Sequence, residues 1–282
     1  MVYGLLAALS WGVAALVAAV AARRIGAFRT VIIGEAVGLA SYGVLFLITH
    51  PSLRGVGAVA WLLLLAGMIG VGGYLACYRG LESGHVGLVS AISASYGGVI
   101  VILSVLLLGE RLTPAAAGGV VLTVTGVVLV SGRASSGASE TARATGAAFG
   151  LAAALFYGVG GFLLGRYTRE FGWLVPALMA RAGAMALLLV LAASPVRRVM
   201  GSRPGPGVAW ALGAGFADAA GVAFFARGGQ AGLVAITAAA SSAYPVIPLI
   251  GGLVLLHERM TRWQAAGAAA ILAGLVLLGA GS

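Results

Sequence analysis

Apolar runs of similar length follow one another along almost the entire sequence, separated by short polar segments. A helix needs about 20 apolar residues to cross the hydrocarbon core of a bilayer. We expect ten spanning helices, at residues 3–22, 29–48, 58–78, 84–107, 114–130, 146–165, 173–192, 207–226, 232–256 and 263–279. Pro245 and Pro248 remove backbone donors inside the ninth helix, which we expect to be kinked or loosened there. The pattern predicts an all-α integral membrane protein with ten transmembrane helices.

Two stretches of the chain repeat each other. Residues 79–113 and 227–261 align without a gap, and 13 of the 35 positions are identical, including Tyr96 with Tyr244 and Glu110 with Glu258. Each unit contains five helices, an odd number, so the second copy enters the membrane from the opposite side. We therefore predict two inverted five-helix repeats, residues 1–131 and 146–282. Residues 132–145, rich in Ser, Gly and charge, form the predicted linker.

The composition points to lipid as the solvent. Hydrophobic residues make up 61% of the chain and charged residues 9%, whereas a soluble domain carries roughly a quarter charged residues. The net charge of +10 comes from arginines that are scattered singly between the apolar runs. Such residues are typical of interfacial anchors, so we expect no nucleic-acid partner. A single cysteine, Cys77, excludes an internal disulfide.

Three motifs carry a resemblance to a known family. Trp11-Gly12 lies in the first helix, residues 90–98 and 241–245 bear serines, and the Gly-Glu-Arg-Leu-Thr sequence of residues 109–113 has its counterpart at 257–261. In these motifs the chain resembles the drug/metabolite transporter superfamily, EamA type, over essentially its whole length. The resemblance implies a central cavity formed chiefly by the first, third, fourth, sixth, eighth and ninth helices. It also matches Arg181 to a frequent arginine of the family, whereas Glu35 takes the equivalent place in the first half.

Two arguments about membrane orientation disagree. Eleven arginines fall on the side shared by the first, third, fifth, seventh and ninth loops, and five fall on the other side, which favours both termini outside the cytoplasm. The resemblance implies both termini inside. We expect the second arrangement, with the linker outside.

Ionisable residues inside the spans are few, and a charge near the bilayer centre costs about 2.5–3.5 kcal/mol on insertion scales. Asp218 is the deepest, its counterpart is Gly70, and the sequence assigns it no compensating charge. We interpret Asp218 as facing a cavity, where it binds a cationic or hydrogen-bonding group or exchanges a proton; the alternative is a protonated side chain bonded to a neighbouring helix. Glu35 is a second candidate for the coupling proton, because burial favours the neutral carboxyl group. For Arg181 we expect a structural role, either reaching the interface or pairing with a carboxylate such as Glu35.

The remaining candidates are aromatic, hydroxyl and capping residues. Phenol and indole groups offer a flat face and a hydrogen bond to a solute, although aromatic residues at membrane interfaces need no function. The predicted substrate-binding residues are Trp11, Tyr74, Ser93, Tyr96, Tyr157, Asp218, Ser241 and Tyr244. The predicted structural residues are Glu110, Arg111, Arg181, Pro245, Glu258 and Arg259.

The sequence favours a secondary transporter of a small metabolite or drug-like solute, such as an amino acid or amine. It contains no phosphate-cradling loop, no Gly-x-Ser-x-Gly elbow and no His-Glu-x-x-His motif. We therefore expect no enzyme activity, no cofactor, no metal and no use of ATP, so that a proton or solute gradient drives transport or the solute equilibrates passively. The expected partners are a small-molecule substrate and membrane lipid, for a monomer or homodimer in the bacterial inner membrane. A lipid-linked flippase or scramblase and a non-transporting scaffold are the alternatives.

Overall fold

The computed structural model describes residues 1–82, 89, 92–131, 140–194, 206–247, 250 and 262–281. The first repeat forms α1 (Val2–Ile25), α2 (Ala27–Thr49), the short 3-10 helix η1 (Val56–Ala58), α3 (Ala60–Glu82), α5 (Tyr96–Leu108) and α6 (Pro114–Ser131). The second forms α7 (Glu140–Arg166), α8 (Thr168–Phe171), α9 (Leu174–Ala193), α11 (Val208–Ala231), α12 (Val234–Ser241) and α14 (Arg262–Ala280). All regular secondary structure within these residues is helical.

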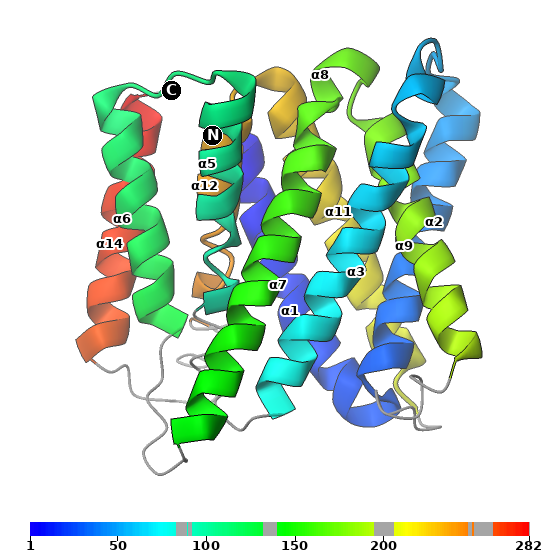
Figure 1. Ribbon diagram of the computed structural model, residues 1–282, viewed down its shortest axis with the longest axis horizontal. Coiled ribbons are helices and arrows are strands. Elements are labelled where there is room, and N and C mark those ends of the chain that lie inside the picture. The colour runs from blue at the N-terminus through cyan, green and yellow to red at the C-terminus, as the bar shows by residue number, and fades with distance from the viewer. Residues whose placement is uncertain are drawn as a thin grey trace.

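The long helices pack side by side in one bundle, and both termini lie at the same end of it (Figure 1). Helix α1 runs away from that end and α7, the first helix of the second repeat, runs toward it, as expected of inverted repeats. Among the described helices, seven are long and apolar enough to cross a membrane, and α5 and α6 are shorter apolar helices. The predicted class is therefore confirmed: the protein is an all-α membrane protein with the architecture of two five-helix repeats.

Apart from the interrupted segments, two helix boundaries lie five or more residues from the sequence-based expectation. Helix α7 begins at Glu140, so residues 140–145, which were expected to belong to the linker, are helical; residues 132–139 lie outside the described part of the chain. Helix α11 continues to Ala231, five residues beyond the expected end at 226. Apolar runs mark where lipid contact stops, but Glu, Ala and Arg have adequate helix propensity and carry α7 past that point. The extension of α11 contains Gly228 and Gly229, which are poor helix formers, but both are buried and pack closely on Thr237 and Thr168, so tertiary packing favours the helix there. The one-turn helix α8 was not predicted, because four residues give no periodic signal.

The ninth spanning segment is interrupted just before Pro245, one of the two prolines from which a kink was predicted. Helix α12 ends at Ser241, and residues 242–245 form turns. There the backbone bonds shift to a spacing of three residues, for example from the Tyr244 N–H to the Ser241 carbonyl at 3.2 Å. Pro245 lacks an N–H and cannot bond to the carbonyl four residues back, which is that of Ser241. Pro248 lies outside the described residues.

The equivalent segment of the first repeat is interrupted too, which was not predicted from the sequence because no proline is present there. Ala94 and Ser95 form a turn directly before α5. The Ser95 N–H donates to the Ile92 carbonyl at 3.1 Å, and the Ser95 hydroxyl donates to the same carbonyl at 2.6 Å. A serine hydroxyl that bonds to a preceding carbonyl competes with the helical bond and bends the helix. The serines, and not the proline alone, are thus the common signal of the two breaks.

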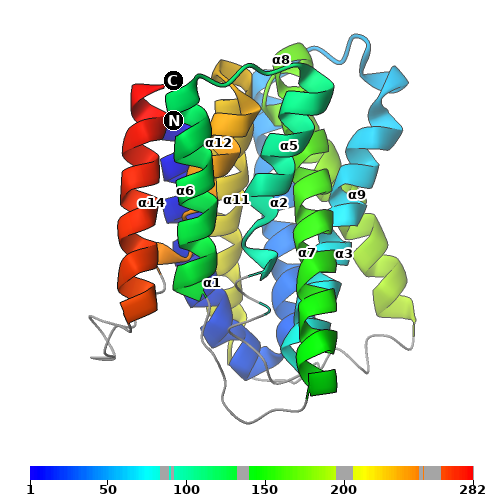
Figure 2. The same cartoon turned by 60° about the vertical axis from the view of Figure 1, so that its left-hand side comes forward.

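Close packing between the repeats depends on two glycines where α3 crosses α9. A Cβ atom added at Gly67 would lie 1.7 Å from the Ala180 carbonyl oxygen, and one added at Gly183 would lie 2.0 Å from the Leu64 carbonyl oxygen. Any side chain would force the two backbones apart, as in other small-residue crossings of membrane helices. At one edge of the bundle α6 and α14, the last helices of the two repeats, run beside each other (Figure 2).

Candidate functional site

Three charged side chains from three helices meet inside the bundle. Arg181 of α9 lies between Glu35 of α2 and Asp218 of α11: its Nη1 atom is 2.8 Å from Glu35 Oε2, and its Nη2 atom donates to Asp218 Oδ2. The Glu35 contact lies within ion-pair distance but outside the angular limits of a directed hydrogen bond. The Asp218 side chain is 22% exposed, whereas those of Arg181 and Glu35 are 6% and 7% exposed. We call these three residues the charged cluster, and Asp218 is its most accessible member.

The expectation that Asp218 lacks a compensating charge is wrong, since Arg181 pairs with it. The sequence could not reveal this, because the pairing depends on α2, α9 and α11 packing together. Of the two alternatives for Arg181, pairing with carboxylates is the one present, and it includes Glu35. Glu35 and Arg181 occupy equivalent places in the two repeats, so the cluster joins the repeats through residues of opposite charge.

Two further residues of α2 shape the charged cluster, and neither was among the residues predicted for the site. A Cβ atom at Gly38 would lie 2.8 Å from Arg181 Nε, so this glycine leaves the path of the arginine open. The fully buried Tyr42 donates its hydroxyl to the carbonyl of Ala219, next to Asp218. Spacings of three and four residues place Glu35, Gly38 and Tyr42 on one helix face, and this periodicity is the signal that identifies them.

The five aromatic residues predicted to contact a solute form one connected chain of rings. The centroid of Tyr157 lies 5.4 Å from that of Tyr74 and 6.4 Å from that of Tyr96. Tyr96 in turn lies 6.4 Å from Tyr244 and 6.5 Å from Trp11. The rings come from α1, α3 and α5 of the first repeat, and from α7 and the turn after α12 of the second. This aromatic chain, as we call it, therefore crosses the boundary between the repeats.

The two predicted serines lie at the interrupted helices, and Ser241 contacts the aromatic chain. Ser93 and Ser241 are both buried, at 5% and 0% exposure. The Ser241 hydroxyl lies 3.5 Å from the Tyr96 hydroxyl and donates to the Ala238 carbonyl at 3.0 Å. The repeat places Ser93 three residues before Tyr96, as it places Ser241 three residues before Tyr244. Hydroxyl groups from both repeats thus gather where the two helices are broken.

The charged cluster and the aromatic chain approach each other along α11. A Cβ atom at Gly221 would lie 2.6 Å from two atoms of the Trp11 indole, so the indole packs directly on the α11 backbone. Gly221 is three residues after Asp218, close to one helical turn. Trp11, a member of the aromatic chain, therefore contacts the helix that carries the accessible carboxylate.

Glu110, predicted as a structural residue, caps a helix of the opposite repeat. Its Oε1 and Oε2 atoms accept the N–H groups of Val234 at 2.8 Å and Ala235 at 2.9 Å, the first two residues of α12. Arg169 Nη2 lies 3.4 Å from Glu110 Oε1. A carboxylate accepts the free N–H groups at a helix start, and its negative charge is favoured there by the helix dipole.

The other predicted structural residues at the bundle ends are less constrained or not described. In the Glu-Arg pair of the first repeat, Glu110 is buried and Arg111 is exposed. Glu258 and Arg259 lie outside the described residues. Within the described part of the chain, no group of three or more His, Cys, Asp or Glu side chains is placed to hold a metal ion.

Comparison with known proteins yields one family. The sequence model of the EamA-like transporter family matches residues 1–132 and 144–280, one match for each half of the chain. A solved crystal structure of a protein superposes with a TM-score of 0.79 at 21% sequence identity, covering 99% of this chain and 97% of that chain. At that identity the likeness shows a common fold. No curated protein matches the chain.

Proposed function

Since the chain belongs to the EamA-like transporter family and is thus a multi-pass membrane transporter of the drug/metabolite type, we propose that it moves a small metabolite or drug-like solute by proton-coupled alternating access. The solute class we favour carries an amine, as amino acids and many drugs do. In this proposal the charged cluster exchanges the proton, and the aromatic chain contacts the solute.

The observation that carries the proposal is the formal charge of the charged cluster. Two carboxylates share one guanidinium, which leaves a net charge of −1 when Glu35 and Asp218 are both ionised. An uncompensated charge among apolar helices costs several kcal/mol, about 2.5–3.5 kcal/mol on insertion scales. A proton on one carboxyl group or a positively charged group of the solute removes this cost. The cluster therefore favours states in which it has bound a proton or a cation.

Asp218 is the carboxylate to which we assign the exchange. It is the most accessible of the three side chains, and within the described residues Arg181 is the one side chain that forms an ion pair with it. Protonation of Asp218 would weaken its attraction to Arg181 and so release α11 from α9. Glu35 would then remain paired with the arginine and keep the charge of the cluster balanced. Proton binding and helix packing are linked in this way through a single side chain.

The aromatic chain supplies the remaining contacts of the proposed solute site. An amine at Asp218 would leave the apolar part of the solute near Trp11, whose indole packs three residues further along α11. Aromatic faces attract cations and provide apolar area with little loss of conformational entropy. Because the rings belong to both repeats, movement of one repeat against the other would separate them and open the site to alternate sides.

The test is uptake of radiolabelled amino acids and small amines into vesicles that contain the purified protein. An imposed pH gradient should accelerate uptake of at least one compound by the wild type. Asp218→Asn should abolish the dependence on the gradient, and Glu170→Gln, which alters an exposed carboxylate of α8, should keep it. Wild-type uptake by the Asp218 variant would contradict the proposal. Redistribution of a fluorescent lipid without solute uptake would instead favour the flippase alternative.

A further inference from the structure

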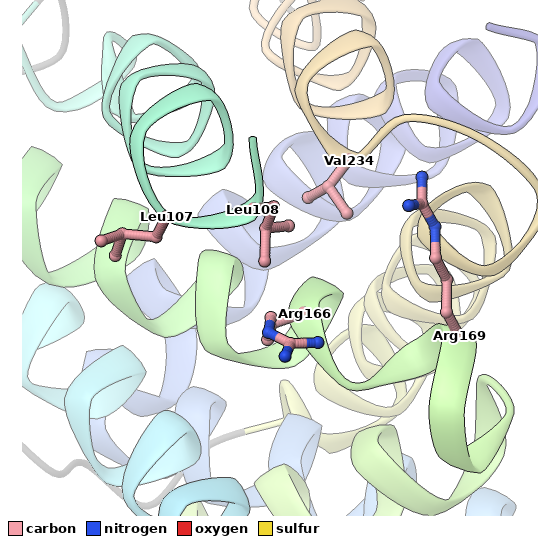
Figure 3. A pocket seen from close by; sticks show the side chains of 5 residues that line it. All are labelled: Leu107, Leu108, Arg166, Arg169 and Val234. Carbon is pink, nitrogen blue, oxygen red and sulfur yellow. The ribbon is translucent and has the colours of Figure 1, made fainter. Parts of the chain in front are cut away.

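A cavity of about 200 Å³ opens at the end of the bundle, away from the charged cluster and the aromatic chain. It is lined by Leu107 and Leu108 at the end of α5, Arg166 at the end of α7, Arg169 in α8 and Val234 at the start of α12. Figure 3 shows the Arg166 guanidinium close to Leu108 and the Arg169 guanidinium on the opposite side, beside Val234. We propose that this cavity binds the phosphate of an anionic phospholipid.

The charge of the cavity supports a phosphate ligand. Arg169 already forms an ion pair with Glu110 and donates a hydrogen bond to the Gly232 carbonyl, and its side chain remains half exposed. The guanidinium of Arg166 lies 5.3 Å from the Tyr167 ring, and within the described part of the chain no carboxylate pairs with it. The buried Glu110 is neutralised by Arg169 and by the two N–H groups of α12. Arg166 therefore has donors left for an anion, and guanidinium groups bind phosphate oxygens through paired hydrogen bonds.

The surroundings of the cavity favour a lipid over a soluble anion. Leu106 and Leu107 of α5 are 73% and 66% exposed, so this side of the helix end faces the acyl chains in the membrane. Arginines at the end of a spanning helix lie at the level of the head groups. Basic pockets between helices at that level are the usual binding sites of anionic head groups. The leucines would contact the first part of an acyl chain while Arg166 and Arg169 hold the phosphate.

Binding can be measured by native mass spectrometry of the full-length protein in detergent, with phosphatidylglycerol or phosphatidylcholine added. The wild type should retain phosphatidylglycerol in preference to phosphatidylcholine. Arg166→Gln should weaken phosphatidylglycerol binding about fivefold, the effect of one arginine near a membrane surface. Arg227→Gln is the matched control, because Arg227 is also exposed and lies over an aromatic ring, that of Trp173 at 5.8 Å, but does not line the cavity.

Three results would overturn the proposal. The two arginine variants could reduce binding equally, which would show a general effect of surface charge. Phosphatidylcholine could bind as well as phosphatidylglycerol and ignore the Arg166 substitution. Inorganic phosphate could bind in an Arg166-dependent manner while phosphatidylglycerol does not, which would make the ligand a soluble anion. None of these measurements depends on transport, so failure of the lipid-binding proposal would leave the proposed transport function unaffected.

Discussion

Replacing Glu110 by glutamine would test how strongly the first repeat holds the interrupted helix of the second. The carboxylate accepts two backbone N–H groups at 2.8 and 2.9 Å and is paired with Arg169. Its side chain is only 2% exposed, so water cannot replace a lost bond. Glutamine keeps the shape but has one acceptor oxygen, and its NH₂ group would face one of the two N–H donors.

The expected cost follows from those contacts. A hydrogen bond to a charged group contributes about 1.5–3 kcal/mol, and a buried donor left without a partner costs about 1–3 kcal/mol. Loss of one such bond, with weaker attraction to Arg169, should lower the free energy of unfolding by about 2–4 kcal/mol. At about 2–4 °C per kcal/mol, the scale for chains of somewhat smaller size, the midpoint of thermal unfolding should fall by roughly 5–15 °C.

The assay is thermal unfolding of the purified protein in detergent, followed by tryptophan fluorescence. Glu170→Gln is the matched control: it makes the same chemical change at an exposed position of α8, next to Arg169, and should leave the midpoint within about 1 °C. If Glu110→Gln also unfolds within about 1 °C of the wild type, the cap does not stabilise the join between the repeats, and our account of the Glu-Arg motif is wrong.

Two further predictions concern the packing and the solute site. Gly67→Ala should destabilise the protein by about 3 kcal/mol or more, because its Cβ would overlap the Ala180 carbonyl, whereas Gly70→Ala, with no atom within 4 Å of its Cβ, should unfold like the wild type. Equal midpoints for the two alanine variants would refute the close crossing of α3 and α9. Tyr96→Ala and Tyr244→Ala should each raise the Kd of the transported solute about tenfold, as expected for loss of an aromatic contact. Unchanged affinity in both tyrosine variants would remove the aromatic chain from the site.

The helices were predictable from sequence because the membrane imposes a length on them. A span must be apolar over about 20 residues, so apolar runs locate spans even where helix propensity is poor. Hydropathy does not mark a helix that continues beyond the lipid, so the start of α7 was expected at residue 146 although the helix begins at Glu140. The proline predicted the interruption near Pro245. The interruption at Ser95 depends on a hydrogen bond from the serine hydroxyl to a backbone carbonyl, which a hydropathy pattern does not reveal.

The candidate site was predictable in its members but not in its contacts. Glu35, Arg181 and Asp218 stood out because charges inside spans are rare. That all three meet at one guanidinium depends on the packing of α2, α9 and α11, which no local pattern encodes. The repeat did relate Tyr96 to Tyr244 as equivalent positions, and equivalent residues of inverted repeats contact each other where they lie close to the axis that relates the repeats. Their ring contact at 6.4 Å agrees with that relation.

The proton exchange at the charged cluster is the central claim, and proton flux tests it most directly. Vesicles that contain the purified protein and a pH-sensitive dye would receive a transported amine from outside, with no pH gradient imposed. The internal pH should change with the wild type, and it should stay constant with Asp218→Asn and with Glu35→Gln, which both remove a carboxylate of the cluster. Solute entry without a change of internal pH in the wild type, or an undiminished change in the Asp218 variant, would contradict the account.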